Sequence, residues 1–194
     1  MKAPKSVRNL TSAEKAQADW RFSAIASERD APVEKYPLQK VWWPATDQAR
    51  AIAGGIVPRQ ERHGYRDAGI LESFFSRYSD GQVLIGDLGG FRPYFRYVAN
   101  YDSELAPWIR SELLSDPTCL LSTCEDLVFI ANEQLNYSVV GASVEIIENL
   151  EYEWGGREQL RKSFEQFLKS GDFGFDVDDE RWAARYLMPW STWE

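Results

Sequence analysis

The feature that most constrains the fold is the stretch from Asp126 to Val144, DLVFIANEQLNYSVVGASV. Two apolar runs, 127–131 and 137–140, flank a polar break at 132–136, a pattern typical of two strands joined by a short turn. The first run is apolar without alternation, so at least one of the two strands should be covered on both faces. We therefore predict a hairpin in the middle of a sheet.

A helix is expected to cover this sheet. The segment 155–171 has one apolar stripe at helical spacing, made of Leu160, Phe164, Phe167 and Leu168. Two oppositely charged pairs four residues apart, Glu158 with Lys162 and Glu165 with Lys169, favour the same helix. We predict that the stripe is core, packed on the strands around Phe129 and Val139.

Shorter sequence patterns predict further helices and strands before and after this hairpin. The expected helices are 11–28, a short one from Thr46-Asp47 to Gly54-Gly55, 67–78, 103–115 and a last one around Trp182 to Leu187. The first of them opens with the capping box Thr11-Ser12-Ala13-Glu14. Expected strands are 82–85, 91–98, 119–122 and 144–147, and the proline-containing segment 30–44 reads as a connection. The prediction is an α+β fold with a central, mostly antiparallel sheet flanked by helices and a helical N-terminal segment.

Length and composition favour one domain. A chain of 194 residues with 44% hydrophobic and 14% aromatic residues can bury a sizeable core. We expect a flexible tail at 1–10 and a single α+β domain at 11–194, on which the segment 11–64 packs. No apolar run is long enough to cross a bilayer and the start is polar, so the expected location is the cytoplasm. Cys119 and Cys124 are interpreted as reduced thiols.

The charges are polarised along the chain. Residues 1–66 carry 12 Lys and Arg against 7 Asp and Glu, a balance of +5, whereas residues 101–156 carry 11 acids against the single base Arg110, a balance of −10. An acidic segment repels phosphate backbones and anionic lipid, so neither nucleic acid nor a membrane is the expected partner of this half. It attracts a basic protein surface, or it is only a solvated face that keeps the protein soluble.

Catalytic signatures are weak. The single histidine, His63, lies in a loop pattern, and its spacing to Asp67 does not require a nucleophilic site. Residues 86–90, GDLGG, lack the order of a phosphate-binding loop and read as a turn. The acidic run 172–180 lacks calcium-loop spacing. We therefore expect no catalytic residue, no metal site and no cofactor.

A resemblance adds to this interpretation. A helical first half, the strand and glycine-rich turn of 82–90, an acidic strand-rich middle and the late helix 157–169 with its SFEQFL run resemble small cytoplasmic immunity proteins of bacterial toxin systems, particularly the SUKH superfamily. The resemblance covers residues 65–170 and implies a protein that binds a cognate toxin and blocks it without catalysis. The long Trp-containing N-terminal segment departs from that pattern, so no family binding residues are carried over.

Two classes of function follow. The first is an immunity protein that occludes the active site of a basic toxin acting on nucleic acid or nucleotides, with surplus aromatics as interface anchors. Its candidate partner-binding residues are Tyr101, Asp102, Glu104, Glu145, Glu148, Glu151, Tyr152, Glu153 and Trp154. The alternative is a small enzyme or a ligand-binding regulatory domain whose acidic residues line a pocket.

Overall fold

The structure is a computed structural model. It describes residues 2–30, 40–44, 50–54, 77–88, 93–102, 104–105, 108–109, 118–132, 137–153, 155–156, 158 and 162. Within these residues no helix is both long enough and apolar enough to span a bilayer.

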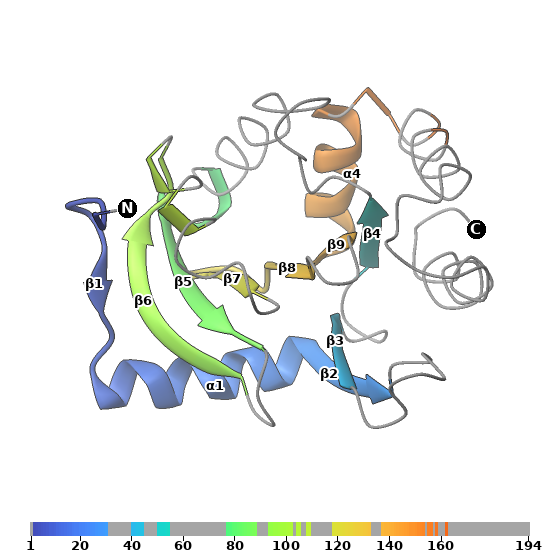
Figure 1. Cartoon of the computed structure of the whole chain (residues 1–194). Helices are drawn as coiled ribbons and strands as arrows, with labels where there is room; N and C mark the ends of the chain where they lie inside the picture. The colour runs from blue at the N-terminus through green and yellow to red at the C-terminus, as the bar shows by residue number, and fades with distance from the viewer. Residues whose placement is uncertain are drawn as a thin grey trace.

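The centre of the molecule is an antiparallel sheet with the strand order β1-β6-β5-β7-β8-β9-β4 (Figure 1). Its strands are β1 (Arg8–Asn9), β4 (Arg50–Gly54), β5 (Gln82–Asp87), β6 (Tyr94–Asn100), β7 (Thr118–Ser122), β8 (Val128–Asn132) and β9 (Tyr137–Ala142). A second, two-stranded sheet pairs β2 (Ala26–Asp30) with β3 (Lys40–Pro44), and the helices that lie wholly within the described residues are α1 (Ser12–Ile25) and α4 (Val144–Glu153). The predicted α+β class with an antiparallel sheet and flanking helices is confirmed.

The predicted hairpin is also confirmed. β8 and β9 pair antiparallel, with Phe129 opposite Val140, and β8 lies inside the sheet between β7 and β9. Val128 and Ile130 are buried in one core cluster, whereas Phe129 is buried in the other. β8 is therefore covered on both faces, as its run of apolar residues without alternation predicts.

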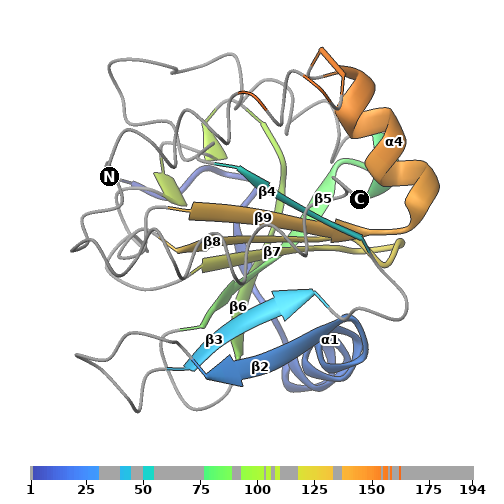
Figure 2. The ribbon, with the colours of Figure 1, turned by 90° about the vertical axis from the view of Figure 1, so that its right-hand side faces the viewer.

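Two hydrophobic cores lie on opposite faces of the sheet. In Figure 2, α4 lies above strands β7, β8 and β9, and α1 lies below them. The first core joins Ile146, Ile147 and Leu150 of α4 to strand residues such as Ile85. The second core joins Phe22 and its neighbours on α1 to the other face. Since each helix covers one face, the sheet is the middle layer of the fold.

A β-bulge decides which face Phe95 occupies. Ile85 pairs with Tyr97 and Gly86 pairs with Phe95, so Arg96 is the additional residue of β6. The side chain of Tyr97 packs against the α4 core, whereas Phe95 is buried in the α1 core. There its ring meets Phe22 edge to face, with centroids 5.6 Å apart. The bulge thus supplies the α1 core with an aromatic residue that regular alternation would have placed on the other face.

The N-terminal helix begins as predicted. The Thr11 hydroxyl accepts a hydrogen bond from the Glu14 amide, and the Glu14 carboxylate accepts one from the Thr11 amide, which completes the capping box. The helix ends at Ile25 instead of 28, because the chain continues into β2. The predicted connection over 30–44 is wrong in its second part, since residues 40–44 form β3.

Two predicted elements are of the wrong type. Residues 144–147, predicted as a strand, open α4, and residues 50–54, predicted as the end of a short helix, form β4 and pair with β9. Both are short segments, where pairing and burial override local preference. The predicted turn at 86–90 begins later, because Gly86 and Asp87 belong to β5.

Several predictions lie partly or wholly outside the described residues. They concern His63, the apolar stripe Leu160, Phe164, Phe167 and Leu168, and the acidic run 172–180. At Glu158 and Lys162, the predicted ion pair is present at 3.6 Å. Of the helix predicted at 67–78, only residues 77 and 78 are described; both are helical, and the predicted end at 79–81 is confirmed, where Asp80 and Gly81 have φ angles of 50° and 72°.

Candidate protein-binding surface

The most prominent acidic surface among the predicted residues is the outward side of α4. Ile146, Ile147 and Leu150 are buried in the core, and the residues that alternate with them at helical spacing point outward. We call Val144, Glu145, Glu148 and Tyr152 the α4 outer face. All four are exposed, Tyr152 at 85% and Val144 at 45%. The face therefore combines two carboxylates with a large aromatic side chain that has most of its surface in solvent.

Polar contacts fix α4 to the segment before β5. Asn149 Nδ2 donates a hydrogen bond to the Tyr78 hydroxyl at 2.8 Å, and Arg77 forms an ion pair with Glu153 at 2.6 Å. Together with the buried apolar residues, these contacts hold the helix at two positions along its length. A binding surface on such a helix is preorganised, so little ordering entropy is lost when a partner docks.

Both ends of α4 are capped by hydrogen bonds from neighbouring residues. At the start, the Ser143 hydroxyl accepts a hydrogen bond from the Ile146 amide at 3.4 Å, as an N-cap residue does. At the end, Gly155 and Gly156 have φ angles of 90° and 94°, and the Gly156 amide donates to the Glu151 carbonyl at 2.7 Å. The cap fixes the last turn, which presents Tyr152 to solvent.

Two residues predicted to be exposed for partner binding are buried. Tyr101 is 7% exposed and belongs to the α4 core together with Leu105 and Trp108, so its expected role as an exposed anchor is wrong. Glu151 is 5% exposed, because it lies on the side of α4 that turns toward the protein. Charge and aromatic character alone did not distinguish these two residues from their exposed neighbours.

Of the other predicted partner-binding residues, some make contacts within the fold and some are exposed. Asp102 accepts hydrogen bonds at Oδ1 from the amides of Glu104 and Leu105, both at 2.9 Å, so it caps the following turn. Glu104 itself is exposed. Glu153 is engaged by Arg77, and Trp154 lies outside the described residues. Since Tyr101 and Leu105 share a core cluster with α4, the 101–105 turn covers the same face of the sheet as that helix.

Sequence reasoning missed Val144 and the two groups that anchor the helix, Arg77 and Asn149. The available signal was the spacing of Ile146, Ile147 and Leu150 after Ser143, which fits a capped helix. The strand prediction for 144–147 rests on the β-branched residues at the start of the segment and does not take this spacing into account.

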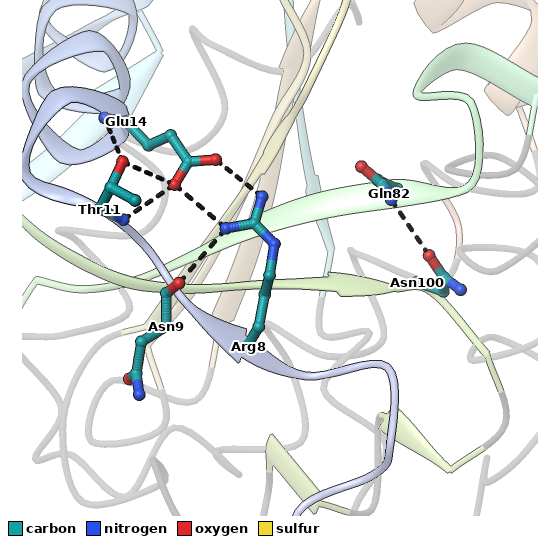
Figure 3. A network of polar contacts seen from close by, with 6 residues as sticks. All are labelled: Arg8, Asn9, Thr11, Glu14, Gln82 and Asn100. Atoms are coloured by element: carbon teal, nitrogen blue, oxygen red, sulfur yellow. Dashed lines mark hydrogen bonds and ion pairs between the residues drawn. The ribbon is translucent and has the colours of Figure 1, made fainter.

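A small groove lies on the other side of the molecule, beside α1. It has a volume of about 170 Å³, a floor of Ala18, Leu84 and Val98, and a polar rim of Arg8, Glu14, Gln17, Arg21, Gln82 and Thr123. Figure 3 shows the Arg8 guanidinium facing the Glu14 carboxylate, with nitrogen–oxygen distances of 2.7 and 3.1 Å. Arg21 donates to three carbonyls, those of Ser122, Thr123 and Glu125. The charged groups of this rim hold the N-terminal segment to the sheet.

The Arg8–Glu14 ion pair leads to a prediction about the stability of the fold at low pH. The hydrogen bonds from Arg8, and then those from Thr11, lower the pKa of Glu14 from 4.5 to about 2. Because the pKa is lowered in the folded state, this pair stabilises the fold fully above pH 4.5, and its contribution is lost as the pH falls toward 2. Carbon-detected NMR titration of the Glu14 carboxylate should give a low pKa in the wild type and an ordinary one in Arg8→Ala. Arg8→Lys, which keeps the charge without the fork of donors, should lie between them.

Cysteines and carboxylates offer no metal site among the described residues, where no group of three or more His, Cys, Asp or Glu is placed to hold an ion. Both cysteines are free thiols, Cys119 buried and Cys124 exposed. Burial raises the pKa of the Cys119 thiol well above its ordinary value, which keeps it protonated.

No family model, no curated protein and no solved structure matches this chain.

Proposed function

We propose that this protein is an immunity protein that binds a cognate bacterial toxin in the cytoplasm and neutralises it by covering its active site. The observation that carries the proposal is the α4 outer face, on which Glu145, Glu148 and Tyr152 are exposed together on one anchored helix. Inhibition of this kind is stoichiometric binding, so the proposal assigns no catalytic residue and no cofactor.

The charge of α4 indicates the chemistry of the partner. The helix holds Glu145, Glu148, Glu151 and Glu153 and no basic residue. Its field attracts a basic surface, speeds the encounter and orients it. Enzymes that act on nucleic acid or nucleotides carry such basic surfaces around their active sites, so the proposed toxin belongs to that class. Other exposed acids, Glu104 and the pair Glu125 and Asp126, add to the same field at longer range.

Tyr152 is the proposed anchor. Exposed carboxylates contribute little net affinity because they remain solvated at the rim of an interface. A tyrosine contributes a large rigid surface and a hydroxyl, and such residues dominate the affinity of many interfaces. On α4, Tyr152 follows Glu148 by one helical turn, so one docking event can engage both side chains.

The test co-expresses the chain with the product of each adjacent gene, and we expect one of these products to be the basic partner. We expect a 1:1 complex and protection of cells from that protein. The variant Glu145→Lys with Glu148→Lys should slow association at least about tenfold at low salt and flatten its salt dependence, with a smaller effect on dissociation. Tyr152→Ala should instead accelerate dissociation and weaken affinity about 30-fold, which corresponds to about 2 kcal/mol.

The matched control is Glu125→Lys with Asp126→Lys, which makes the same change of charge at exposed positions in the β7–β8 turn. Glu151 and Glu153 are left unchanged because one is buried and the other is paired with Arg77. If both double variants slow association equally, only the net charge matters and the α4 outer face is not the docking surface. If no product of an adjacent gene binds, the immunity function is wrong.

A further inference from the structure

Arg21 of α1 binds the β7–β8 turn through both terminal nitrogens of its guanidinium group. Nη1 donates to the carbonyls of Ser122 and Thr123 at 2.8 and 2.9 Å, and Nη2 donates to the carbonyl of Glu125 at 2.8 Å. Hydrogen bonds from an ionised donor are stronger than neutral ones, and the rigid fork of a guanidinium fixes their directions. One side chain of α1 therefore holds the backbone of the whole turn.

The side chains of the same turn bind the segment before β5. Ser122 Oγ donates to the Tyr78 carbonyl and Thr123 Oγ1 donates to the Ser79 carbonyl, both at 2.9 Å. Cys124 Sγ also donates to the Tyr78 carbonyl, at 3.2 Å. Ser122 and Ser79 are fully buried, so their hydrogen bonds are shielded from water. The turn therefore joins α1 to the segment that also contacts α4.

Tyr78 continues this series of contacts to α4. Its side chain packs against the α4 core, and its hydroxyl accepts the hydrogen bond from Asn149 at 2.8 Å. The preceding residue, Arg77, pairs with Glu153 in the last turn of the helix. Since α1 and α4 lie on opposite faces of the sheet (Figure 2), the contacts run from one face to the other at the end of strands β7 and β8.

We propose that Arg21 is a positioning residue for α4, because it fixes the β7–β8 turn and, through the turn, Tyr78. In the closed state Arg21 binds the carbonyls of the turn; in the open state water binds them and the turn leaves the Tyr78 carbonyl. Both donors from the turn are then lost together, so opening of the turn and loosening of α4 are one local event. The consequence for binding rests on the proposed function, in which the α4 outer face is the docking surface.

NMR of the full chain measures the coupling without a partner. The side-chain amide signals of Asn149 depend on its hydrogen bond to the Tyr78 hydroxyl, and in Arg21→Met they should shift toward the values of a free amide. Methionine keeps an apolar stem, and water can bind the released carbonyls, so the fold should be retained. Arg21→Lys, which keeps the charge without the fork of donors, should restore part of the shift.

Lys15→Met is the matched control. Lys15 is also a half-buried cation on α1, but it donates to the Tyr94 hydroxyl and does not contact the turn. The Asn149 signals should therefore be unchanged in Lys15→Met. A double-mutant cycle gives a second measurement: the effects of Arg21→Met and Asn149→Ala on the unfolding constant should deviate about fivefold from their product, whereas those of Lys15→Met and Asn149→Ala should multiply.

Binding tests the functional consequence. Arg21→Met should accelerate dissociation of the basic partner about fivefold, although Arg21 lies on the opposite face of the sheet from α4. Unchanged Asn149 signals in Arg21→Met, the same shift in Lys15→Met, or a cycle without coupling would overturn the proposal. A partner that binds with an unchanged dissociation rate would also show that Arg21 does not position the docking surface. If no partner binds, the immunity function fails, but the NMR and stability results on the chain alone still decide the coupling.

Discussion

Replacing Phe22 by alanine is expected to lower the free energy of unfolding by about 3 to 5 kcal/mol. The side chain is fully buried, and its ring meets Phe95 edge to face at 5.6 Å. The substitution removes this contact and leaves a cavity between α1 and the sheet, in a core that is close-packed elsewhere. Urea denaturation followed by circular dichroism measures the loss directly.

Trp20→Ala is the matched control for Phe22→Ala. It removes a larger aromatic side chain from the same helix, but at a position 74% exposed, so the stability should change by less than about 0.5 kcal/mol. Equal midpoints for wild type and Phe22→Ala would show that α1 does not cover this face of the sheet.

The second large effect is expected at Gly86. A Cβ atom at this position would lie 3.0 Å from two ring carbons of Phe95 and 3.2 Å from the Cys119 sulfur. These neighbours are buried in the α1 core and have little room to move, so Gly86→Ala should cost about 1 to 3 kcal/mol. Glycine is required here by the close approach of a ring, because its backbone conformation is ordinary for a strand.

A double-mutant cycle identifies the cause. If the Phe95 ring is the obstacle, Gly86→Ala should cost less in a Phe95→Leu background than in the wild type, with a coupling energy of about 1 kcal/mol. Purely additive effects would place the obstacle elsewhere. An undiminished stability of Gly86→Ala alone would contradict the register that pairs Gly86 with Phe95.

Local sequence predicted the parts of the fold in which local and global preferences agree. The hairpin of β8 and β9 has β-branched runs around a polar turn, and the start of α1 has a complete capping box, so each could be found without knowledge of the rest. The burial of β8 on both faces followed from its unbroken apolar run.

The remaining elements depend on partners distant in the sequence. Residues 50–54 form a strand because β9 pairs with them, although their own composition favours a helix. The face of Phe95 depends on a bulge at Arg96, which no local pattern announces. Pairing across the sheet determines both features, so they cannot be predicted from local sequence alone.

The candidate surface shows the same division. Net charge correctly indicated that α4 carries exposed acids at Glu145 and Glu148. It could not separate them from Glu151, because burial depends on the angle around the helix, and the sequence predicts only a strand, at 144–147, in this segment. Once the helix is recognised, the spacing of Ile146, Ile147 and Leu150 orients every other residue of α4.

The order of the strands has a consequence for how the chain reaches its fold. β5 to β9 form a block of neighbours, whereas β1 and β4, from the first 54 residues, close its two opposite edges. During synthesis these N-terminal strands leave the ribosome first, but the edges to which they pair do not yet exist. Arg8 pairs with Val98, 90 residues later, and Arg50 pairs with Ala142, 92 residues later. Contacts of this length raise the contact order and slow the final steps of folding. Until then the N-terminal strands and both edges of the block are open to pairing with other chains, so aggregation during expression should depend on how rapidly β1 and β4 dock.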